Sequence, residues 1–260
     1  MTTTAAPREA TARRSALPRD IAMRLAADEY ANFVEQLRQL APQDWTMQTC
    51  CPTWDMHAMV CHVLGSAEMS ASLPEQFRQM RAARKAGGLF IDALTDLQVR
   101  KHRHRSPTDL VAMLAEVGPK AAAARRRTPA PVRRIPMADM PVEETGSRTE
   151  KWTLGYLIDV ILTRDTWMHR SDIATATGRA MALRPEHDGV IVADIAAEWD
   201  SRHGQACTLL LTGPAGGRWD FNGAAPNGEA PSYELDAVEF SRILAGRGQG
   251  DGLLAARVPF

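Results

Sequence analysis

The chain has 260 residues, of which 45% are hydrophobic, and its 31 Lys and Arg balance its 31 Asp and Glu. This length accommodates one large domain or two modest ones. No apolar run approaches the roughly 20 residues of a membrane-spanning helix, which argues against an integral membrane protein.

The cysteines and the first residues indicate the compartment. Cys50, Cys51, Cys61 and Cys207 form neither CxxC pairs nor the dense framework of small secreted domains. The N-terminal segment is polar and basic and lacks the apolar stretch of a signal peptide. We therefore expect a reduced, soluble, cytoplasmic protein, with residues 1–17 as a disordered tail.

Charge is distributed unevenly along the chain. Residues 78–134 contain fourteen Lys and Arg against four Asp and Glu, whereas residues 181–260 contain six against eleven. A basic stretch can mark nucleic-acid binding. This one lacks interleaved aromatic residues and a known motif, so we do not expect nucleic acid as a partner. A solvated surface, or a rim that attracts an anionic small molecule, fits the pattern better. His102 and His104 lie in this basic run, and we expect both to be solvated.

Helical periodicity dominates the first two thirds of the chain. Residues 20–40 repeat apolar side chains on one face. A second helix is predicted to begin near Thr53, which suits an N-cap position. Residues 74–105 read as two helices separated by a Gly-Gly pair, and another helix starts at Pro107. Residues 128–148 are rich in proline, and no element is predicted there.

The longest predicted helix covers residues 151–179. Asp165 and His169 lie four residues apart in it, so they share one face about one turn apart. A carboxylate and an imidazole placed in this way can bind one metal ion together. The same spacing is also compatible with an Asp–His hydrogen bond in the core or at its edge.

His62 is a third candidate ligand. It lies between Met59 and Val63, on the apolar side of the second helix. Facing helices of a bundle can bring it to Asp165 and His169. Two imidazoles and one carboxylate leave positions open on a metal, which suits catalysis, and they fit Zn²⁺ or non-haem Fe(II) equally well. The alternative is a core histidine that donates to a backbone carbonyl.

Beyond residue 180 the pattern changes to short, mixed elements. The predicted helices and strands there are a helix over 185–200, strands near 207–211, 218–221 and 233–235, and a helix over 237–245. Long helices followed by mixed elements indicate an α+β fold with two domains, residues 18–180 and residues 181–260.

Three stretches resemble the mycothiol-dependent maleylpyruvate isomerase family. TCCPTW at 49–54, followed by VCHVLG at 60–65, resembles the family's "CPGW…AHLLG". LGYLIDVILTRDTWMHRSDIATATGR at 154–179 is similar to "LG…DVILTRDxWMHRxDIARATGR". DAVEFSRILAGRGQGDGLLAARVPF at 236–260 is similar to "EFxRxLSGR…GLL…VPF". The resemblance covers nearly the whole chain beyond the tail and implies a DinB-like metal-binding four-helix bundle followed by a smaller α/β domain.

The resemblance also implies a site and a chemistry. A divalent metal, for which we expect Zn²⁺, would be held by His62, Asp165 and His169. In the isomerase itself the acidic ligand is Glu, so Asp165 is one methylene shorter, which suggests another branch of the family. The C-terminal domain would contribute a catalytic arginine, with Arg247 as the best match and Arg242 next. Mycothiol would be the co-substrate, activated by the metal for isomerisation of, or transfer to, a small electrophile.

Two alternatives stay open at this point. One is a metal-dependent hydrolase or biosynthetic enzyme that is built on the same bundle and uses no thiol. The other is a non-catalytic binding or regulatory protein that uses the basic middle segment to meet an acidic partner or nucleic acid. In every case we expect a monomer or homodimer with no membrane partner.

Overall fold

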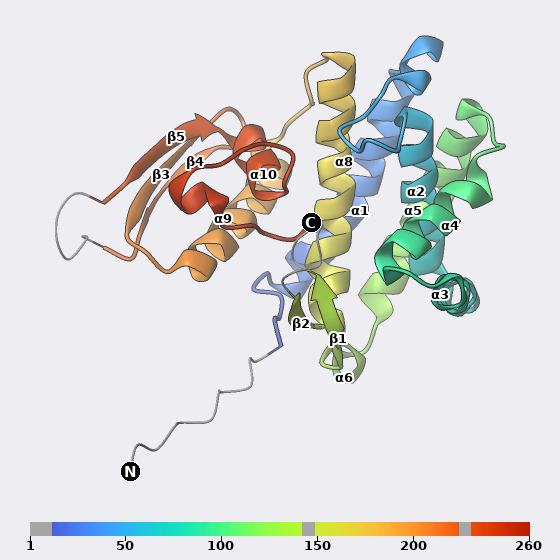
Figure 1. Cartoon of the computed structure of the whole chain (residues 1–260), viewed down its shortest axis with the longest axis horizontal. Coiled ribbons are helices and arrows are strands. Elements are labelled where there is room, and N and C mark those ends of the chain that lie inside the picture. The colour runs from blue at the N-terminus through green and yellow to red at the C-terminus, as the bar shows by residue number, and fades with distance from the viewer. Residues whose placement is uncertain (1–11, 142–148, 224–229) are drawn as a thin grey trace.

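The computed structural model describes residues 12–141, 149–223 and 230–260. It confirms the predicted α+β class: a bundle of long helices is followed by a small mixed sheet with two helices (Figure 1). Over the described part of the chain, no helix combines the length and apolar character needed to cross a membrane.

Four long helices form the bundle, and they lie side by side in Figure 1. These are α1 (Arg19–Arg38), α2 (Met56–Ala71), α5 (Pro107–Arg127) and α8 (Leu162–Thr177). Their apolar faces bury one continuous core, in which Phe33, Met59 and Leu114 have no exposed surface. The start of α2 differs from the prediction, because Asp55 is the N-cap and its carboxylate accepts from the Ala58 backbone N–H at 2.8 Å.

A helical hairpin packs on the outside of α2. It consists of α3 (Leu73–Ala86) and α4 (Phe90–His102), and α4 contacts α2 along its length. As predicted, Gly87 and Gly88 separate the two helices. Both have φ of 75°, which disfavours any side chain.

The helix predicted over 151–179 is shorter at its start and is not uniform. Residues up to Thr153 belong to strand β2 (Thr149–Thr153), which pairs antiparallel with β1 (Pro136–Pro141). The segment 128–148, where no element was predicted, thus contains β1 and the short helix α6 (Ala130–Arg133), while residues 142–148 lie outside the described residues. Helical structure begins with α7 (Leu154–Tyr156) and passes through a π-helical turn into α8.

The π-helical turn covers Leu157–Ile161, one turn before Asp165. A π turn holds one more residue than an α turn, so it changes the direction in which the preceding side chains point. At the other end, α8 stops at Gly178 in the left-handed conformation (φ 66°), as predicted.

The C-terminal part is a three-stranded sheet with two helices. Its elements are α9 (Val190–His203), β3 (Cys207–Thr212), β4 (Gly217–Phe221), β5 (Ser232–Asp236) and α10 (Ala237–Leu244). The strand order is β4-β3-β5: β3 is antiparallel to β4 and parallel to β5. Single turns of other helix types flank these elements and the start of the bundle, namely Pro42–Thr46, Pro185–Gly189 and Gly252–Ala255.

Helix α8 belongs to both hydrophobic cores. Ile173 packs into the bundle core, whereas Trp167 and Met168 pack with Trp199 and Phe240 of the C-terminal part. Figure 1 shows α8 between the sheet and the rest of the bundle. The division into residues 18–180 and 181–260 stays a prediction, since side chains on both sides of it share one core.

Residues 12–17 of the predicted tail are ordered. The Arg13 backbone N–H donates to the Lys151 carbonyl at 2.7 Å, and the Thr153 N–H donates to the Arg13 carbonyl at 2.9 Å. The Arg13 guanidinium also reaches Glu150 at 3.2 Å. Only residues 1–11 of the predicted tail lie outside the described residues.

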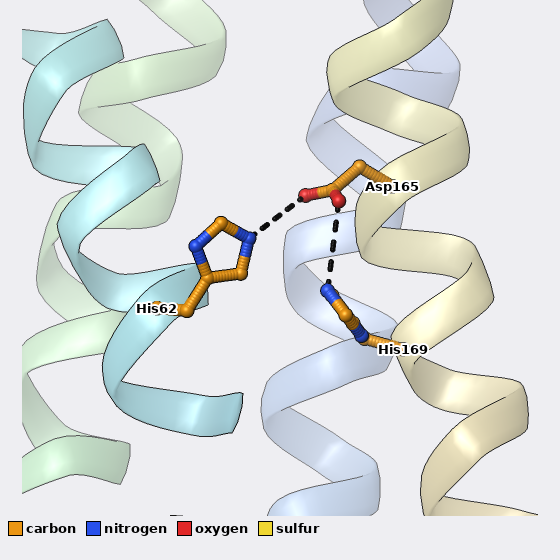
Figure 2. Close-up of side chains that lie close together, drawn as sticks. All are labelled: His62, Asp165 and His169. Atoms are coloured by element: carbon orange, nitrogen blue, oxygen red, sulfur yellow. Dashed lines mark ion pairs between the residues drawn. The ribbon is translucent and has the colours of Figure 1, made fainter. Parts of the chain in front are cut away.

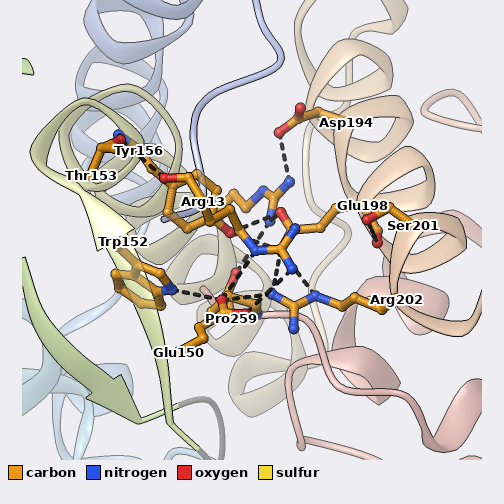
Figure 3. A network of polar contacts seen from close by, with 11 residues as sticks. Arg13, Glu150, Trp152, Thr153, Tyr156, Asp194, Glu198, Ser201, Arg202 and Pro259 are labelled. Atoms are coloured by element: carbon orange, nitrogen blue, oxygen red, sulfur yellow. Dashed lines mark hydrogen bonds and ion pairs between the residues drawn. The ribbon is translucent and has the colours of Figure 1, made fainter. Parts of the chain in front are cut away.

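A buried ion network joins this N-terminal segment to the C-terminal part (Figure 3). Arg164 of α8 donates to Asp194 at 2.6 Å and to Glu198 at 2.8 Å, both on α9, and Glu198 also accepts from the Tyr156 hydroxyl at 2.8 Å. The Pro259 carbonyl accepts from the same guanidinium at 3.3 Å. The network therefore fixes α8, α9 and the last residues relative to one another.

Replacing Arg164 by Met should destabilise the fold strongly. The change leaves the buried Asp194 side chain without its guanidinium partner, whereas Glu198 keeps Arg202 at 2.6 Å. Removing one partner of a buried ion pair typically costs about 3–5 kcal/mol. Urea unfolding followed by far-UV circular dichroism measures this. Arg100→Met is the control, because Arg100 and Asp96 form an exposed pair on α4 and its loss should cost less than about 0.5 kcal/mol. Equal midpoints for the two variants would contradict the structural role of the network.

Candidate metal centre

The structure brings His62, Asp165 and His169 together, as predicted. His62 comes from α2, and the other two residues come from successive turns of α8 (Figure 2). The Asp165 carboxylate lies 3.7 Å from His62 Nε2 and 3.5 Å from His169 Nε2. One ligand atom from each residue lies within 4.8 Å of the others.

A hydrogen-bonded chain of amides sets the orientation of His62. Gln79 donates to the Gly65 carbonyl at 3.0 Å, which directs its own amide oxygen to the Gln98 NH₂ group at 2.9 Å. The Gln98 oxygen then faces His62 Nδ1 at 2.8 Å and can only accept there. His62 Nδ1 consequently carries the proton, and the lone pair of Nε2 is directed toward Asp165.

Gly65 makes this chain possible. A Cβ atom at this position would lie 2.6 Å from Gln98 Cβ and 3.1 Å from Gln98 Cα. Helix α4 therefore approaches α2 at the one turn where no side chain stands between them. The fully buried Gln98 depends on that approach to reach His62.

His169 is oriented by a carboxylate. Its Nδ1 atom lies 3.1 Å from Asp172 Oδ2, so Nε2 again faces the centre. Asp172 is 1% exposed and also accepts from Arg242 at 3.1 Å, from Arg247 at 2.9 Å and from the Cys50 thiol at 3.0 Å. Arg242 and Arg247, predicted as catalytic residues, are thus both bound to the carboxylate that positions His169.

The electrostatics of the centre without metal follow from these contacts. Burial would raise the pKa of Asp165, but the imidazoles of His169 and His62 outweigh burial and hold that pKa well below its usual range. Burial lowers the pKa of His169, and the carboxylates of Asp165 and Asp172 more than reverse this, giving a pKa of about 10. A positive charge is therefore stabilised between Asp165 and Asp172.

These residues fit a divalent metal. Ligand atoms about 2.0–2.1 Å from a tetrahedral zinc ion are about 3.3 Å apart. The separations of 3.5 Å from Asp165 Oδ1 to His169 and 3.7 Å from Oδ2 to His62 are close to this spacing, and all three ligand atoms lie within 4.8 Å of one another. Both Nδ1 atoms are paired with buried acceptors, an arrangement common among metal-binding histidines. Asp165 is shorter than the expected Glu, yet its carboxylate reaches both imidazoles.

A second buried acidic cluster does not fit a metal. Glu29, His187 and Asp188 also lie within ligand distance of one another. Arg170 already supplies a cation there, with Nη1 3.0 Å from Glu29 and 3.1 Å from Asp188. Trp167 Nε1 donates to the same Asp188 oxygen at 2.9 Å. This cluster is an internal ion network that joins α1, α8 and the turn before α9.

The centre opens into a cavity of about 730 Å³. His62 and Asp165 line it, together with Arg247 from the C-terminal part. The indole of Trp54 packs beside the centre, with its ring centroid 5.0 Å from that of His62 and 6.3 Å from that of His169. The volume is typical of a site for a small organic ligand.

A few basic residues of the middle segment bind internal partners, although most of its Lys and Arg side chains are exposed. Buried Arg125 donates to the Ile158 carbonyl and the Thr163 hydroxyl, both at 2.6 Å. Lys101 binds Glu68 at 2.5 Å. His102, which we expected to be solvated, is 2% exposed and lies 2.9 Å from the same Glu68 carboxylate. Part of the local charge excess therefore stabilises the bundle.

Sequence reasoning missed several residues around the centre. Gln79 and Gln98 lie in the segment whose helices were predicted without any function, and Cys50 and Trp54 were noted only as part of a motif. Asp172 lies three residues after His169 in the predicted helix, but that spacing alone does not distinguish a partner of the histidine from a surface charge. A polar residue at a buried helical position is the pattern that identifies Gln98, but only once its packing against Gly65 is known.

The chain matches the family model described as the mycothiol maleylpyruvate isomerase N-terminal domain over residues 23–174, which is more than half of its length. A crystal structure of a mycothiol-dependent maleylpyruvate isomerase is similar at 20% identity and a TM-score of 0.54, covering 91% of this chain and 92% of that one. A histidine-to-alanine mutant of such an isomerase gives 16% identity and a TM-score of 0.54, covering 89% and 90%. No curated protein matches the chain significantly.

Replacing Gln98 by Leu should weaken metal binding about 10–100-fold, the usual effect of removing the partner of a ligand histidine. The affinity is measured by competition with a chromophoric zinc chelator. Gln76→Leu is the matched control, because Gln76 lines the same cavity but lies outside the amide chain. If both variants keep the wild-type metal affinity, the amide chain does not control how His62 binds the metal.

Metal affinity should rise with pH. A metal that binds His169 Nε2 must displace a proton from a group whose pKa is about 10. Below that pH, the fraction of unprotonated His169 rises about tenfold with each pH unit. The apparent metal affinity should therefore also rise about tenfold per pH unit between about pH 6.5 and 8.5. Calorimetry in buffers of different ionisation enthalpy should show about one proton released per metal. A pH-independent affinity would contradict the protonated His169.

Proposed function

Because the chain belongs to the mycothiol maleylpyruvate isomerase family, we propose that it is a metal-dependent enzyme that uses a low-molecular-weight thiol to attack a small electrophile. The observation that carries this proposal is the pair of imidazoles whose Nε2 atoms face Asp165 at the wall of an open cavity. Mycothiol is the proposed thiol, and the reaction is an isomerisation or a thiol transfer.

We assign the metal to His62, Asp165 and His169, and we propose Zn²⁺ because two imidazoles and one carboxylate suit it and leave a position open. When bound, the metal would lower the pKa of a thiol that ligates it, so that the thiolate is present at neutral pH.

The chain's own residues supply orientation and charge. The amide chain that ends at Gln98 holds His62 in one tautomer, and Asp172 does the same for His169. Arg247 uses Nε and Nη2 on Asp172 and lines the cavity, so its remaining NH₂ edge is assigned to negative charge that develops on the substrate. Arg242 is more deeply buried, and its one ion pair with the described residues is the one with Asp172.

The chemical step is an addition. The thiolate sulfur forms a bond to one carbon of a C=C double bond that is conjugated to a carbonyl. The C=C electron pair shifts to form a double bond to the carbonyl carbon, and the carbonyl electron pair moves onto its oxygen, which gives an enolate. In an isomerisation, rotation about the resulting single bond is followed by return of the electron pair and loss of the thiolate. In a transfer, a proton adds instead and the thiol stays attached.

Metal content and thiol dependence test this function. Wild-type protein should hold about one equivalent of zinc and should consume the thiol of mycothiol, or isomerise maleylpyruvate, only when metal and thiol are both present. His169→Ala should lose the metal and fall to the background rate, since one of three ligands is gone. His104→Ala is the control, because His104 is an exposed histidine.

Each result has a distinct meaning. Stoichiometric zinc retained by His169→Ala would overturn the ligand assignment. Turnover of an electrophile by the zinc form without any thiol would instead support a thiol-independent metalloenzyme on the same centre.

A further inference from the structure

Most of the cavity that opens from the metal centre has apolar walls. Three parts of the chain contribute several of these side chains each: α4, the helix that begins at Leu154, and the last residues. Phe90, Leu94, Leu157, Ile161 and Phe260 are among the side chains that contribute. Phe90 is 39% exposed, so part of this apolar surface already faces solvent. A wall of this kind gains affinity from an apolar ligand body, at about 25 cal/mol for each Å² removed from water.

The charged groups of the cavity are few and mostly cationic. Among the described residues that line it, three have an Asp, Glu, Lys or Arg side chain: Asp165, Arg247 and Arg257. The Asp165 carboxylate lies between His62 and His169. Among these side chains, an anionic ligand therefore meets two guanidinium groups, and the one carboxylate, that of Asp165, is directed to the two imidazoles.

The two arginines flank Gly246. Arg247 is its neighbour in sequence, and a Cβ atom at Gly246 would lie 3.6 Å from Arg257 Nη1. Arg257 donates to the Ile243 carbonyl through Nη1, which fixes the guanidinium beside this turn. No other hydrogen bond or ion pair of its guanidinium occurs with residues that the structure describes, so its other edge can bind a ligand oxygen. Arg247, in contrast, is already paired with Asp172.

We infer that the electrophile is an amphipathic anion: a carboxylate held by Arg257 with an extended aromatic or alkyl body against the apolar walls. This inference rests on the proposed function, since it names the substrate class of the same cavity. Arg257 is then a specificity residue that selects the carboxylate, and Phe90 is one that selects the body. The volume of about 730 Å³ leaves room for a thiol beside such a molecule.

Three small ligands test this inference without any turnover. 4-Phenylbutanoate carries both features, 4-phenylbutan-1-ol lacks the charge, and butanoate lacks the apolar body. We expect 4-phenylbutanoate to bind the zinc-loaded protein at least about tenfold more tightly than either of the others, measured by titration calorimetry. Equal binding of the acid and the alcohol, or of the long and the short acid, would overturn the inference.

Two variants separate the contributions. Arg257→Gln should lower the affinity for 4-phenylbutanoate about tenfold and leave the alcohol unchanged. Phe90→Ser, at a partly exposed position, should weaken both phenyl ligands but not butanoate. Arg218→Gln is the control, because Arg218 is exposed and pairs with Asp220 on β4. An Arg257→Gln protein that keeps the wild-type preference for the acid would remove Arg257 from the site.

Zinc itself attracts carboxylates, so the titrations are repeated on chelator-treated protein. A preference for the acid that survives metal removal belongs to the arginines, whereas a preference that disappears belongs to the metal and contradicts the role of Arg257. The outcome is independent of the proposed chemistry. If 4-phenylbutanoate binds as expected but no thiol-dependent turnover is found, the proposed function is rejected and the substrate class stands. If turnover is found without the preference for 4-phenylbutanoate, only the substrate class is rejected.

Discussion

One buried carboxylate, Asp172, connects the two parts of the molecule. An ionised group with 1% exposure is costly to bury unless neighbouring charges and donors compensate it. The compensation comes from Arg242 and Arg247 of the C-terminal part, from Cys50 before α2, and from His169 on the same helix. Neither part supplies all of these donors, so the orientation of His169 depends on their assembly.

The other imidazole is oriented by neutral groups. The Gln98 amide accepts from His62, and its orientation is fixed by Gln79, which donates to the Gly65 carbonyl on the same helix as His62. A carboxylate partner makes an imidazole more basic than an amide partner does, so the two histidines differ electronically although both direct Nε2 to Asp165. The centre thus combines one strongly and one weakly polarised ligand, both held from outside.

The sequence predicted the features that depend on helical spacing alone. Asp165 and His169 share a face because backbone geometry places residues four apart over one another, and His62 lies on a helix too apolar to be anything but buried. Gln98 was missed because its role depends on the side-by-side packing of α4 and α2 at Gly65. Residues 151–153 of strand β2 were predicted as helix because a short strand that runs directly into a helix leaves little periodicity of its own. The buried His102 was misjudged because its basic neighbours suggested solvent.

The π-helical turn at Leu157–Ile161 lies between part of the cavity wall and the metal ligands on one continuous helix. Its extra residue is absorbed locally, so gaining or losing it would rotate the helix before it by about 100° while Asp165 and His169 keep their place. Leu154, Leu157 and Ile161 line the cavity from this segment, so a change of one residue at the turn would alter part of the cavity wall while the ligands keep their place. The selectivity of the cavity for organic ligands can therefore change through this turn without any change in the residues proposed to hold the metal.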